Sequence, residues 1–340
     1  MLGMSWELNN IMLKLSFNIN QIKFLSIFLF WLCCLSILVI NSYSSKKNIE
    51  TSVFVDTLRQ FDVSNDNINK ITKLYIADEP NFSTEDLVTV FNDNNYSYET
   101  IMQYKKVPNI YISSLPKDFG KITSSNKKKS LFVRSILPLV IKENNKIRSI
   151  NNKIKLIKNN FKMIGKNDAA WLNKMMDSYK VKSNNIDELL VKVDIVPVSI
   201  ALGQAAIESG WGTSRFAMEG NALYGQWSWK VGSGIIPKER NENENYEIKS
   251  FLSLSNSVSS YMKNLNTHYN YENFRINRSL LREHNLPVLG SYLYKYLNGY
   301  ATDSNYSETL IKIIEINNFK ELENVEIKFV DSNPELINLT

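Results

Sequence analysis

Apolar residues are spaced along most of this chain as they are in α-helices. One set recurs at alternating intervals of three and four: Ile147, Ile150, Ile154, Ile157, Phe161 and Ile164. This spacing predicts one long amphipathic helix that begins near Pro138 and ends at Gly165. Its other faces carry many Lys and Arg residues, read as a solvated surface, with binding to cell wall or lipid as the alternative. Further helices are predicted over residues 169–179, 186–191 and from Ser257 through His268. The fold class is therefore mainly α.

A glycine-punctuated stretch interrupts this helical pattern and predicts a β-hairpin. Residues 232–240 would form one strand, 241–245 the turn, and 246–251 the return strand. The chain is thus expected to be α+β, with a helical body and a small β lobe.

The first apolar run predicts a membrane anchor. Residues 24–40 contain no charged side chain, and with Gln21 and Ile22 the run approaches the ~20 residues that cross a bilayer. A cleaved signal peptide is the alternative, although the run exceeds its usual apolar length of about 7–15 residues. The organisation predicted from this is a cytoplasmic N-terminus (1–21), a transmembrane helix (22–40), a weakly structured stalk with one small helical or β element (41–105), a helical part (106–192), a catalytic core (193–322) and a tail (323–340).

Composition narrows the class of protein. With 340 residues, of which 44% are hydrophobic, the chain can bury a core, and wholesale disorder is excluded. The net charge of +6 favours an anionic partner such as a cell wall, but no basic stripe indicates nucleic acid. Cys33 and Cys34 are adjacent and are the only cysteines, which excludes a disulfide framework. With only two histidines, His268 and His284, a His/Cys zinc site is excluded, and neither a metal nor an organic cofactor is expected.

One carboxylate lies where an acid for glycoside cleavage is expected. Pro197 begins a helix of small and apolar residues, and Glu208 falls in its last turn before Gly210 and Gly212 end it. The negative end of the helix dipole and the apolar surroundings both raise the pKa of such a carboxyl group. A carboxylic acid still protonated near neutral pH can protonate a glycosidic oxygen. A merely solvated Glu at a helix end is the alternative.

Aromatic and amide side chains follow Glu208 closely. Five aromatic residues can either stack on sugar rings or pack in the core: Trp211, Phe216, Tyr224, Trp227 and Trp229. Asn221, Gln226 and Ser228 add neutral groups suited to hydroxyl and acetamido groups. The region is therefore a candidate sugar site.

Several of these segments together resemble a known family. Residues 204–217 (QAAIESGWGTSRFA), 221–227 (NALYGQW) and 299–306 (GYATDSNY) are similar to the signatures of bacterial cell-wall β-N-acetylglucosaminidases of glycoside hydrolase family 73. The Bax-like subgroup is the most similar, because residues 193–197 and 264–268 also fit it. The resemblance covers about residues 105 to 320.

The resemblance implies a lysozyme-like fold and a set of site residues. Glu208 takes the position of the family's general acid, Tyr300 that of its site tyrosine, and either Glu239 or Glu247 that of an assisting β-lobe carboxylate. For Asp303 a loop or helix-cap role is favoured over substrate binding, and for His268 a packing or capping role. The expected substrate-binding residues are Ser209, Trp211, Asn221, Tyr224, Gln226, Trp227, Asp303 and Tyr306.

The expected activity is hydrolysis of peptidoglycan by an endo-β-N-acetylglucosaminidase, which cleaves β-1,4 bonds after N-acetylglucosamine. The expected partners are peptidoglycan glycan strands and, through the anchor, a membrane, with the catalytic domain on the periplasmic side of a bacterial inner membrane. A lytic transglycosylase, a non-catalytic wall-binding protein and an enzyme acting on glycoprotein glycans are the alternatives.

Overall fold

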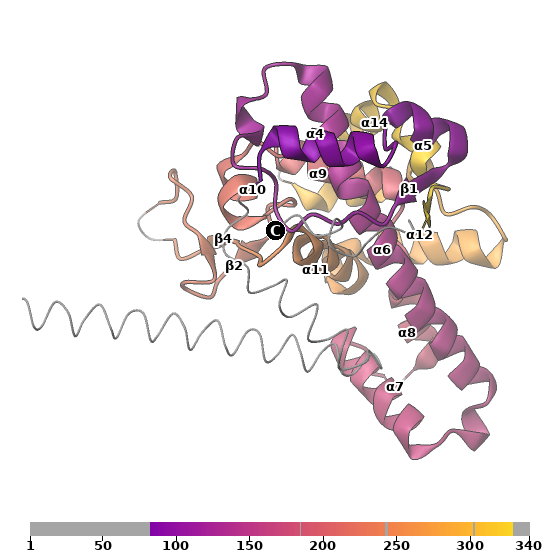
Figure 1. Cartoon of the computed structure of the whole chain (residues 1–340). Helices are drawn as coiled ribbons and strands as arrows, with labels where there is room; N and C mark the ends of the chain where they lie inside the picture. The colour runs from indigo at the N-terminus through magenta and orange to yellow at the C-terminus, as the bar shows by residue number, and fades with distance from the viewer. Residues whose placement is uncertain (1–81, 184, 242–243, 302, 329–340) are drawn as a thin grey trace, which may run out of the picture. The chain divides into compact units, whose positions relative to one another are not determined.

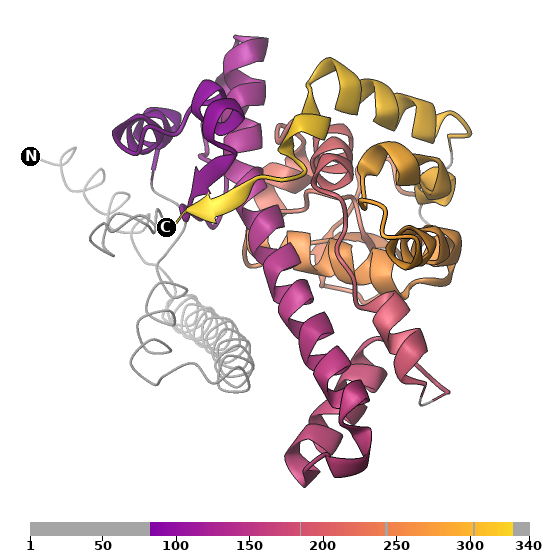
Figure 2. The same cartoon turned by 90° about the vertical axis from the view of Figure 1, so that its right-hand side faces the viewer.

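The computed structural model describes residues 82–328, apart from 184, 242–243 and 302 (Figures 1 and 2). The predicted cytoplasmic N-terminus and anchor, and most of the predicted stalk and tail, lie outside these residues. Within the described ranges, no helix has both the length and the apolar character needed to span a bilayer.

The described residues are mainly helical, with two small sheets. The helices are α4 (Thr84–Asp93), α5 (Tyr98–Tyr104), α6 (Ser125–Asn159), α7 (Lys166–Ser178), α8 (Ile186–Lys192), α9 (Val198–Glu208), α10 (Arg215–Gly220), α11 (Leu254–Thr267), α12 (Glu272–Glu283), α13 (Gly290–Leu293) and α14 (Tyr306–Ile316). Short 3₁₀ turns are η1 (Phe119–Lys121), η2 (Phe161–Met163), η3 (Tyr269–Tyr271), η4 (Tyr294–Tyr300) and η5 (Phe319–Leu322). The strands are β1 (Lys106–Pro108), β2 (Trp227–Ser228), β3 (Gly234–Ile235), β4 (Glu247–Lys249) and β5 (Glu326–Lys328).

The predicted hairpin is present but short. β4 lies between β3 and β2 and is antiparallel to both, so that Ile248 is opposite Ile235 on one side and Trp227 on the other. Separately, β1 and β5 pair in parallel, so that the segment after α5 lies beside the last described residues, as Figure 2 shows. The prediction of a mainly α fold with a small β lobe is confirmed.

Helix α9 lies at the centre of the helical body. It packs against α6, α14 and η5, and its residues 198–206 are all buried (Figure 1). At Gly203 a Cβ would come within 2.8 Å of the Leu310 side chain, so the glycine permits the close approach of α14. This packing fixes the C-terminal end of α9, where Glu208 lies.

The predicted start of the long helix is wrong. Helix α6 begins at Ser125, whose preceding residue Ser124 accepts a hydrogen bond from the Lys127 amide at 3.3 Å, and Pro138 lies inside the helix. Proline removes one backbone hydrogen bond, but burial of the apolar residues on both sides of it stabilises the continuous helix. The helix also ends earlier than predicted, at Asn159, and Phe161 is exposed in η2.

The described part of the predicted stalk is folded. Residues 84–104 form α4 and α5, each begun by a serine capping box, and they bury Leu87, Phe91 and Ile101 in the main core. Many Asn, Ser and Asp residues in this segment concealed the single apolar face of each short helix. Residues 84–104 therefore contain two short helices, where one small helical or β element was expected.

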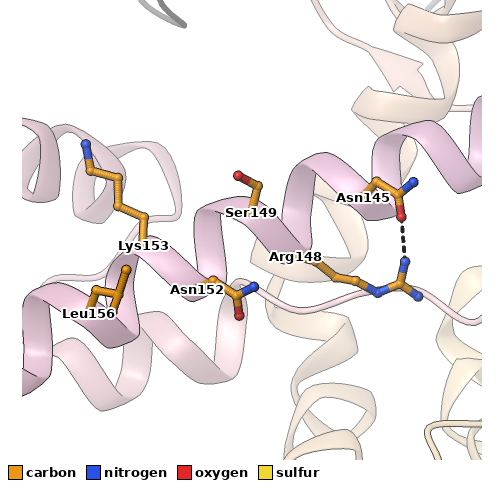
Figure 3. A pocket seen from close by; sticks show the side chains of 6 residues that line it. All are labelled: Asn145, Arg148, Ser149, Asn152, Lys153 and Leu156. Atoms are coloured by element: carbon orange, nitrogen blue, oxygen red, sulfur yellow. Dashed lines mark hydrogen bonds between the residues drawn. The ribbon is translucent and has the colours of Figure 1, made fainter.

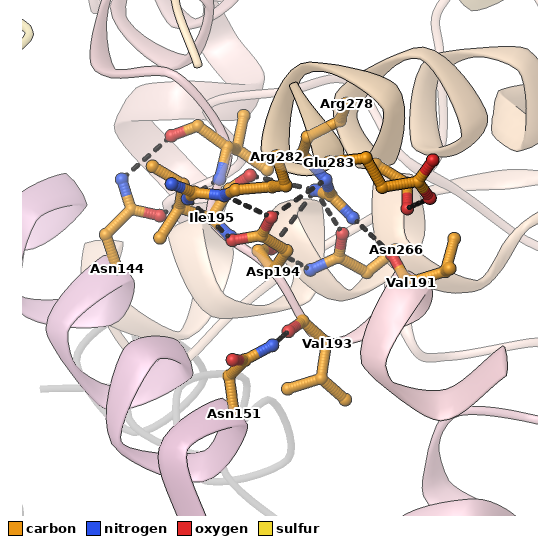
Figure 4. Close-up of polar contacts among 12 residues, drawn as sticks. Asn144, Asn151, Val191, Val193, Asp194, Ile195, Asn266, Arg278, Arg282 and Glu283 are labelled. Carbon is orange, nitrogen blue, oxygen red and sulfur yellow. Dashed lines mark hydrogen bonds and ion pairs between the residues drawn. The ribbon is translucent and has the colours of Figure 1, made fainter. Parts of the chain in front are cut away.

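A buried arginine connects α12 to the segment that enters α9 (Figure 4). The Arg278 guanidinium donates hydrogen bonds of 2.8–3.1 Å to the carbonyl oxygens of Asp194, Ile195 and Val191 and to Oδ1 of Asn266. The Asp194 carboxylate also accepts two bonds of 3.0 Å from Arg282. Burial raises the pKa of Asp194, but the two guanidinium groups outweigh this and hold the pKa below its usual range.

Candidate active site

Glu208 reaches a partly exposed position at the end of the buried helix α9. Its Oε1 atom accepts a hydrogen bond of 2.7 Å from the Tyr306 hydroxyl, which comes from the first turn of α14. The packing of α9 on α14 brings these two side chains together across 98 residues of sequence. One carboxylate oxygen is therefore fixed by the fold.

A chain of buried side chains supports this contact. The Tyr261 hydroxyl donates to Oε1 of Gln204 at 2.7 Å, and the Gln204 amide donates to the Tyr306 hydroxyl at 2.9 Å. Gln204 lies one turn before Glu208 on the same face of α9, and Gln204, Tyr261 and Tyr306 are buried. In this series of hydrogen bonds each group donates to the next, from Tyr261 through Gln204 to Tyr306. The Tyr306 hydroxyl therefore donates to Glu208.

The second oxygen of Glu208 faces the backbone of Gly225. A Cβ placed on Gly225 would lie 3.4 Å from Oε2, and Gly225 has φ +59°, which glycine adopts without strain. Because Oε1 already accepts the hydrogen bond from the Tyr306 hydroxyl, Oε2 is the oxygen available to carry the proton of the carboxylic acid.

The surroundings of Glu208 raise its pKa. Burial is the largest cause, because it disfavours the charged form, and the hydrogen bond from Tyr306 acts in the opposite direction. The carboxylate at the C-terminal end of a helix also faces the negative end of the dipole. Both the burial and the position agree with the prediction for a general acid.

Tyr300 lies beside this acid, but its hydroxyl is already bonded. It donates to the backbone carbonyl of Tyr224 at 2.8 Å, and its ring stacks on Tyr306 with centroids 5.6 Å apart. Tyr300 therefore covers one side of the Glu208–Tyr306 pair and ties it to the segment that contains Gly225.

The two candidate β-lobe carboxylates differ sharply. Glu247 is buried, and its two oxygens accept backbone N–H bonds of 2.8 Å from Gly232 and Gly234. These bonds lower the pKa of Glu247, that of Gly232 most. Glu239, by contrast, is exposed. The Glu247 carboxylate is used to hold the turn between β2 and β3.

Several predicted substrate-binding residues have structural roles here. Ser209 is buried, and its hydroxyl donates to the Ala205 carbonyl at 2.5 Å and accepts from the Gly212 amide at 2.8 Å. Trp211 packs edge-on against Phe132 with centroids 5.8 Å apart. These contacts fix the turn that follows α9, so Ser209 in particular has no free hydroxyl for a sugar.

Tyr224 and Asn221 also contribute to the framework. Tyr224 is buried and stacks on Tyr261 with centroids 3.7 Å apart, and its hydroxyl is buried without a partner among the described residues. Asn221 ends α10 with φ 51° and donates its side-chain amide to the Phe251 carbonyl at 3.2 Å. Of the aromatic residues predicted to bind sugar, Trp227 is exposed, whereas Tyr224 is part of the core.

The remaining predicted residues make hydrogen bonds within the fold. Gln226 donates to the Ser260 carbonyl at 3.4 Å, and its Oε1 is buried without a described partner. Asp303 is exposed and accepts a hydrogen bond of 2.9 Å from the Asn305 amide just before α14, which is the turn role favoured for it. His268 ends α11 and accepts from the Asn270 amide at 3.3 Å, as expected for a capping residue. Within residues 82–328, no group of three or more His, Cys, Asp or Glu side chains is placed to hold a metal ion.

Gln204 and Tyr261 were not identified from the sequence. Gln204 could have been, because it is the polar residue one turn before Glu208 in an otherwise apolar helix. Tyr261 lies in α11, and nothing in its local sequence indicates that it contacts α9.

A Tyr306→Phe substitution tests how Glu208 is held. Because the lost hydrogen bond lowers the pKa of Glu208, its removal should raise that pKa and move the alkaline limb of the pH–activity profile to higher pH. We expect kcat to fall by about three- to tenfold, since the acid itself remains. Tyr261→Phe, which lies two hydrogen bonds further from Glu208, should move the limb less. An alkaline limb that stays in place or moves to lower pH would contradict this arrangement.

A shallow hollow on α6 contributes no acid–base chemistry. It has a volume of about 600 Å³, and Figure 3 shows that its lining side chains all come from this one helix: Asn145, Arg148, Ser149, Asn152, Lys153 and Leu156. None of these is a carboxylate or a histidine, and Arg148 donates to Asn145 at 2.7 Å. The candidate site therefore remains at Glu208.

Comparisons with known proteins point to the same region. The glucosaminidase family, described as mannosyl-glycoprotein endo-beta-N-acetylglucosaminidase, matches residues 183–319. Protein bax of Escherichia coli (strain K12) is 34% identical over 196 residues, which are 56% of this chain and 69% of that protein. Exo-glucosaminidase LytG of Bacillus subtilis (strain 168) is 28% identical over 159 residues, which are 44% of this chain and 55% of that protein. The crystal structure of the catalytic domain of the autolysin Auto from Listeria monocytogenes is 18% identical, covers 47% of this chain and 89% of its own, and has a TM-score of 0.29, too low to support an argument about the fold.

Proposed function

The chain belongs to the Bax-like glucosaminidase family, and from that premise we propose that it hydrolyses the β-1,4 bond after N-acetylglucosamine inside peptidoglycan glycan strands. The observation that carries this proposal is Glu208, a partly exposed carboxyl group whose pKa is raised by burial and whose Oε1 is held by Tyr306. A protonated, positioned carboxyl group is what cleavage of a glycosidic bond requires first.

The chemistry starts at Oε2 of Glu208. In the protonated acid, Oε2 donates its proton to the glycosidic oxygen as the bond to the anomeric carbon breaks. The pair of electrons stays on the leaving oxygen, and positive charge develops on the sugar ring. Glu208 is then an anion, stabilised by the Tyr306 hydroxyl, and can take a proton from the water that attacks the anomeric carbon.

The group that assists Glu208, by stabilising the positive charge on the sugar ring, has two possible sources. Glu247 is an unsuitable one, because both of its oxygens already accept backbone N–H bonds. Glu239 remains as a β-lobe carboxylate, and the acetamido group of the substrate itself is the other source. The exposure of Glu239 favours the acetamido group.

A Glu239→Gln variant separates these two sources. We expect it to keep its activity on purified peptidoglycan within about tenfold of the parent, because water screens the charge of an exposed carboxylate and weakens its effect on the reacting sugar. Rates of release of soluble fragments measure this. A loss as large as that caused by changing Glu208 would instead assign the second role to Glu239.

We further propose that the enzyme works on the periplasmic face of a bacterial inner membrane, attached through residues 22–40. Its proposed substrate lies on that side, and the apolar run of residues 24–40, together with Gln21 and Ile22, approaches the ~20 residues that cross a bilayer. Fractionation of cells, followed by protease treatment of spheroplasts, tests this: the enzyme should sediment with membranes and be digested from outside.

The products of digestion test the proposed reaction. Purified peptidoglycan treated with the enzyme should yield fragments with N-acetylglucosamine at the new reducing end, identified by borohydride reduction and mass spectrometry. Long oligomers early in the reaction indicate endo cleavage, whereas disaccharides from the start indicate exo cleavage, the mode named for LytG. Anhydro-muramyl ends would make the protein a lytic transglycosylase, and binding without release would make it a wall-binding protein.

A further inference from the structure

Three aromatic side chains of the β lobe contact one another on its surface. Trp227 is 58% exposed and Trp229 is 69% exposed, and both contact the partly exposed Tyr246. Trp227 and Tyr246 stack with centroids 4.5 Å apart and planes 17° apart. Trp229 meets each of them edge-on, at 6.2 Å from Trp227 and 6.1 Å from Tyr246. We call these three residues the aromatic platform.

Two tryptophans exposed in one cluster are unusual, because burying each of them would stabilise the fold by a large amount. Exposed apolar patches with a polar rim are typical of binding sites. Ser228 and Lys230 are sequence neighbours of the two tryptophans, and the rings offer flat faces and edges. The apolar C–H face of a sugar ring fits an aromatic face, while its hydroxyl groups stay in contact with water.

The platform lies close to Glu208 along the chain. A Cβ added to Gly225 would lie 3.4 Å from Oε2 of Glu208, and Trp227 and Trp229 follow Gly225 by two and four residues. An extended chain advances at most about 3.6 Å per residue, so Trp229 lies within roughly 15 Å of Gly225. A glycan strand bound at Glu208 can therefore reach the platform with neighbouring sugars of the same strand.

The backbone under the platform is held rigidly. The Glu247 carboxylate bridges the amides of Gly232 and Gly234, and the Lys249 amide donates to the Gln226 carbonyl at 2.8 Å. At Gly234 a Cβ would lie 2.1 Å from the Ile248 carbonyl oxygen, so only glycine permits this strand pairing. These contacts fix the turn that follows Trp229, which makes Glu247 a positioning residue.

We propose that Trp227, Trp229 and Tyr246 form a glycan-binding subsite that stacks on N-acetylhexosamine rings of the strand being cut, away from the bond that is cleaved. This inference rests on the proposed function, since the ligand is the substrate of that same site. It gives Trp229 and Tyr246 a role in substrate affinity. The role of Glu247 is then to position the platform, and not to take part in catalysis.

Binding to a catalytically inactive background tests the platform. Glu208→Gln protein is titrated with peptide-free glycan strands, prepared from peptidoglycan with an amidase, and tryptophan fluorescence and calorimetry are recorded. We expect Trp229→Ala in this background to weaken binding by about tenfold or more, and Trp229→Phe to keep most of the affinity. Tyr104→Ala, which removes a 62% exposed aromatic residue from α5, is the matched control and should bind like its parent.

Kinetics separate this inference from the proposed function. In otherwise wild-type enzyme, Trp229→Ala should raise KM with little change in kcat, because the platform binds sugar without touching the reacting atoms. Equal binding by the Trp229→Ala and Tyr104→Ala proteins, or a KM unchanged by Trp229→Ala, would overturn the platform while leaving hydrolysis intact. If the wild-type enzyme releases no products but Trp229→Ala still weakens binding, the platform stands and the proposed hydrolysis fails.

Discussion

Replacing Glu208 by Gln should lower kcat on peptidoglycan by about 10²–10⁴-fold, the usual contribution of a positioned general acid. Glutamine has nearly the same shape, and its amide oxygen can still accept the hydrogen bond from Tyr306. Its amide nitrogen, which replaces Oε2, cannot supply a proton of comparable acidity. The variant should therefore bind glycan and unfold at the same urea concentration as the parent, while its rate of product release falls.

Glu219→Gln is the matched control for this change. Glu219 lies on α10 with an exposed side chain, in an ion pair of 3.6 Å with Arg215. Its substitution should leave kcat unchanged, because exposed ion pairs contribute little. A Glu208→Gln protein as active as the Glu219→Gln protein would show that Glu208 is not the acid.

Arg278→Met should give the largest loss of stability, about 3–5 kcal/mol in the free energy of unfolding. Methionine fills much of the same space but leaves the carbonyl oxygens of Ile195 and Val191 and Oδ1 of Asn266 without the donor they have in Arg278. The Asp194 carbonyl loses one of its two donors and keeps the Asn266 amide. The substitution also leaves the Asp194 carboxylate with Arg282 as its remaining guanidinium partner. Because the folded-state pKa of Asp194 lies below its unfolded value, its stabilising contribution is present at neutral pH and disappears as the pH falls through the folded pKa.

Arg282→Met provides the comparison on the same helix. Arg282 contacts the same carboxylate at 3.0 Å, but its side chain is about half exposed, so its loss should cost about 1 kcal/mol or less. Urea unfolding of the two variants at neutral pH measures the difference. Equal losses of unfolding free energy would show that the burial of Arg278 adds nothing to its contribution to stability.

The sequence predicted the site best where the signals are local. Pro197 before α9 and the glycines after Glu208 determine where that helix begins and ends, and small side chains between them indicate its burial. The glycine-bounded strands of the β lobe were predicted for the same reason. Pro138 misled the prediction of α6, because a proline that usually begins a helix lies inside this one, where apolar residues on both sides are buried.

The parts of the site that were missed depend on contacts distant in sequence. Tyr261 reaches Gln204 across 57 residues, through packing that no local pattern encodes. Glu247 was a candidate from the sequence, but its contact with Gly232, 15 residues away, was not predicted. Whether an aromatic residue is exposed is equally a property of the fold. Tyr224 and Trp227 are three residues apart, yet one is buried against Tyr261 and the other lies on the surface.

Digestion of purified peptidoglycan in ¹⁸O-labelled water tests the central claim most directly. If Glu208 catalyses hydrolysis after N-acetylglucosamine, the wild-type enzyme should place one ¹⁸O atom on the anomeric carbon of each new N-acetylglucosamine end. The Glu208→Gln protein should release almost no labelled product over the same time. Unlabelled anhydro-muramyl ends from the wild type, or equal labelling by both proteins, would contradict the account.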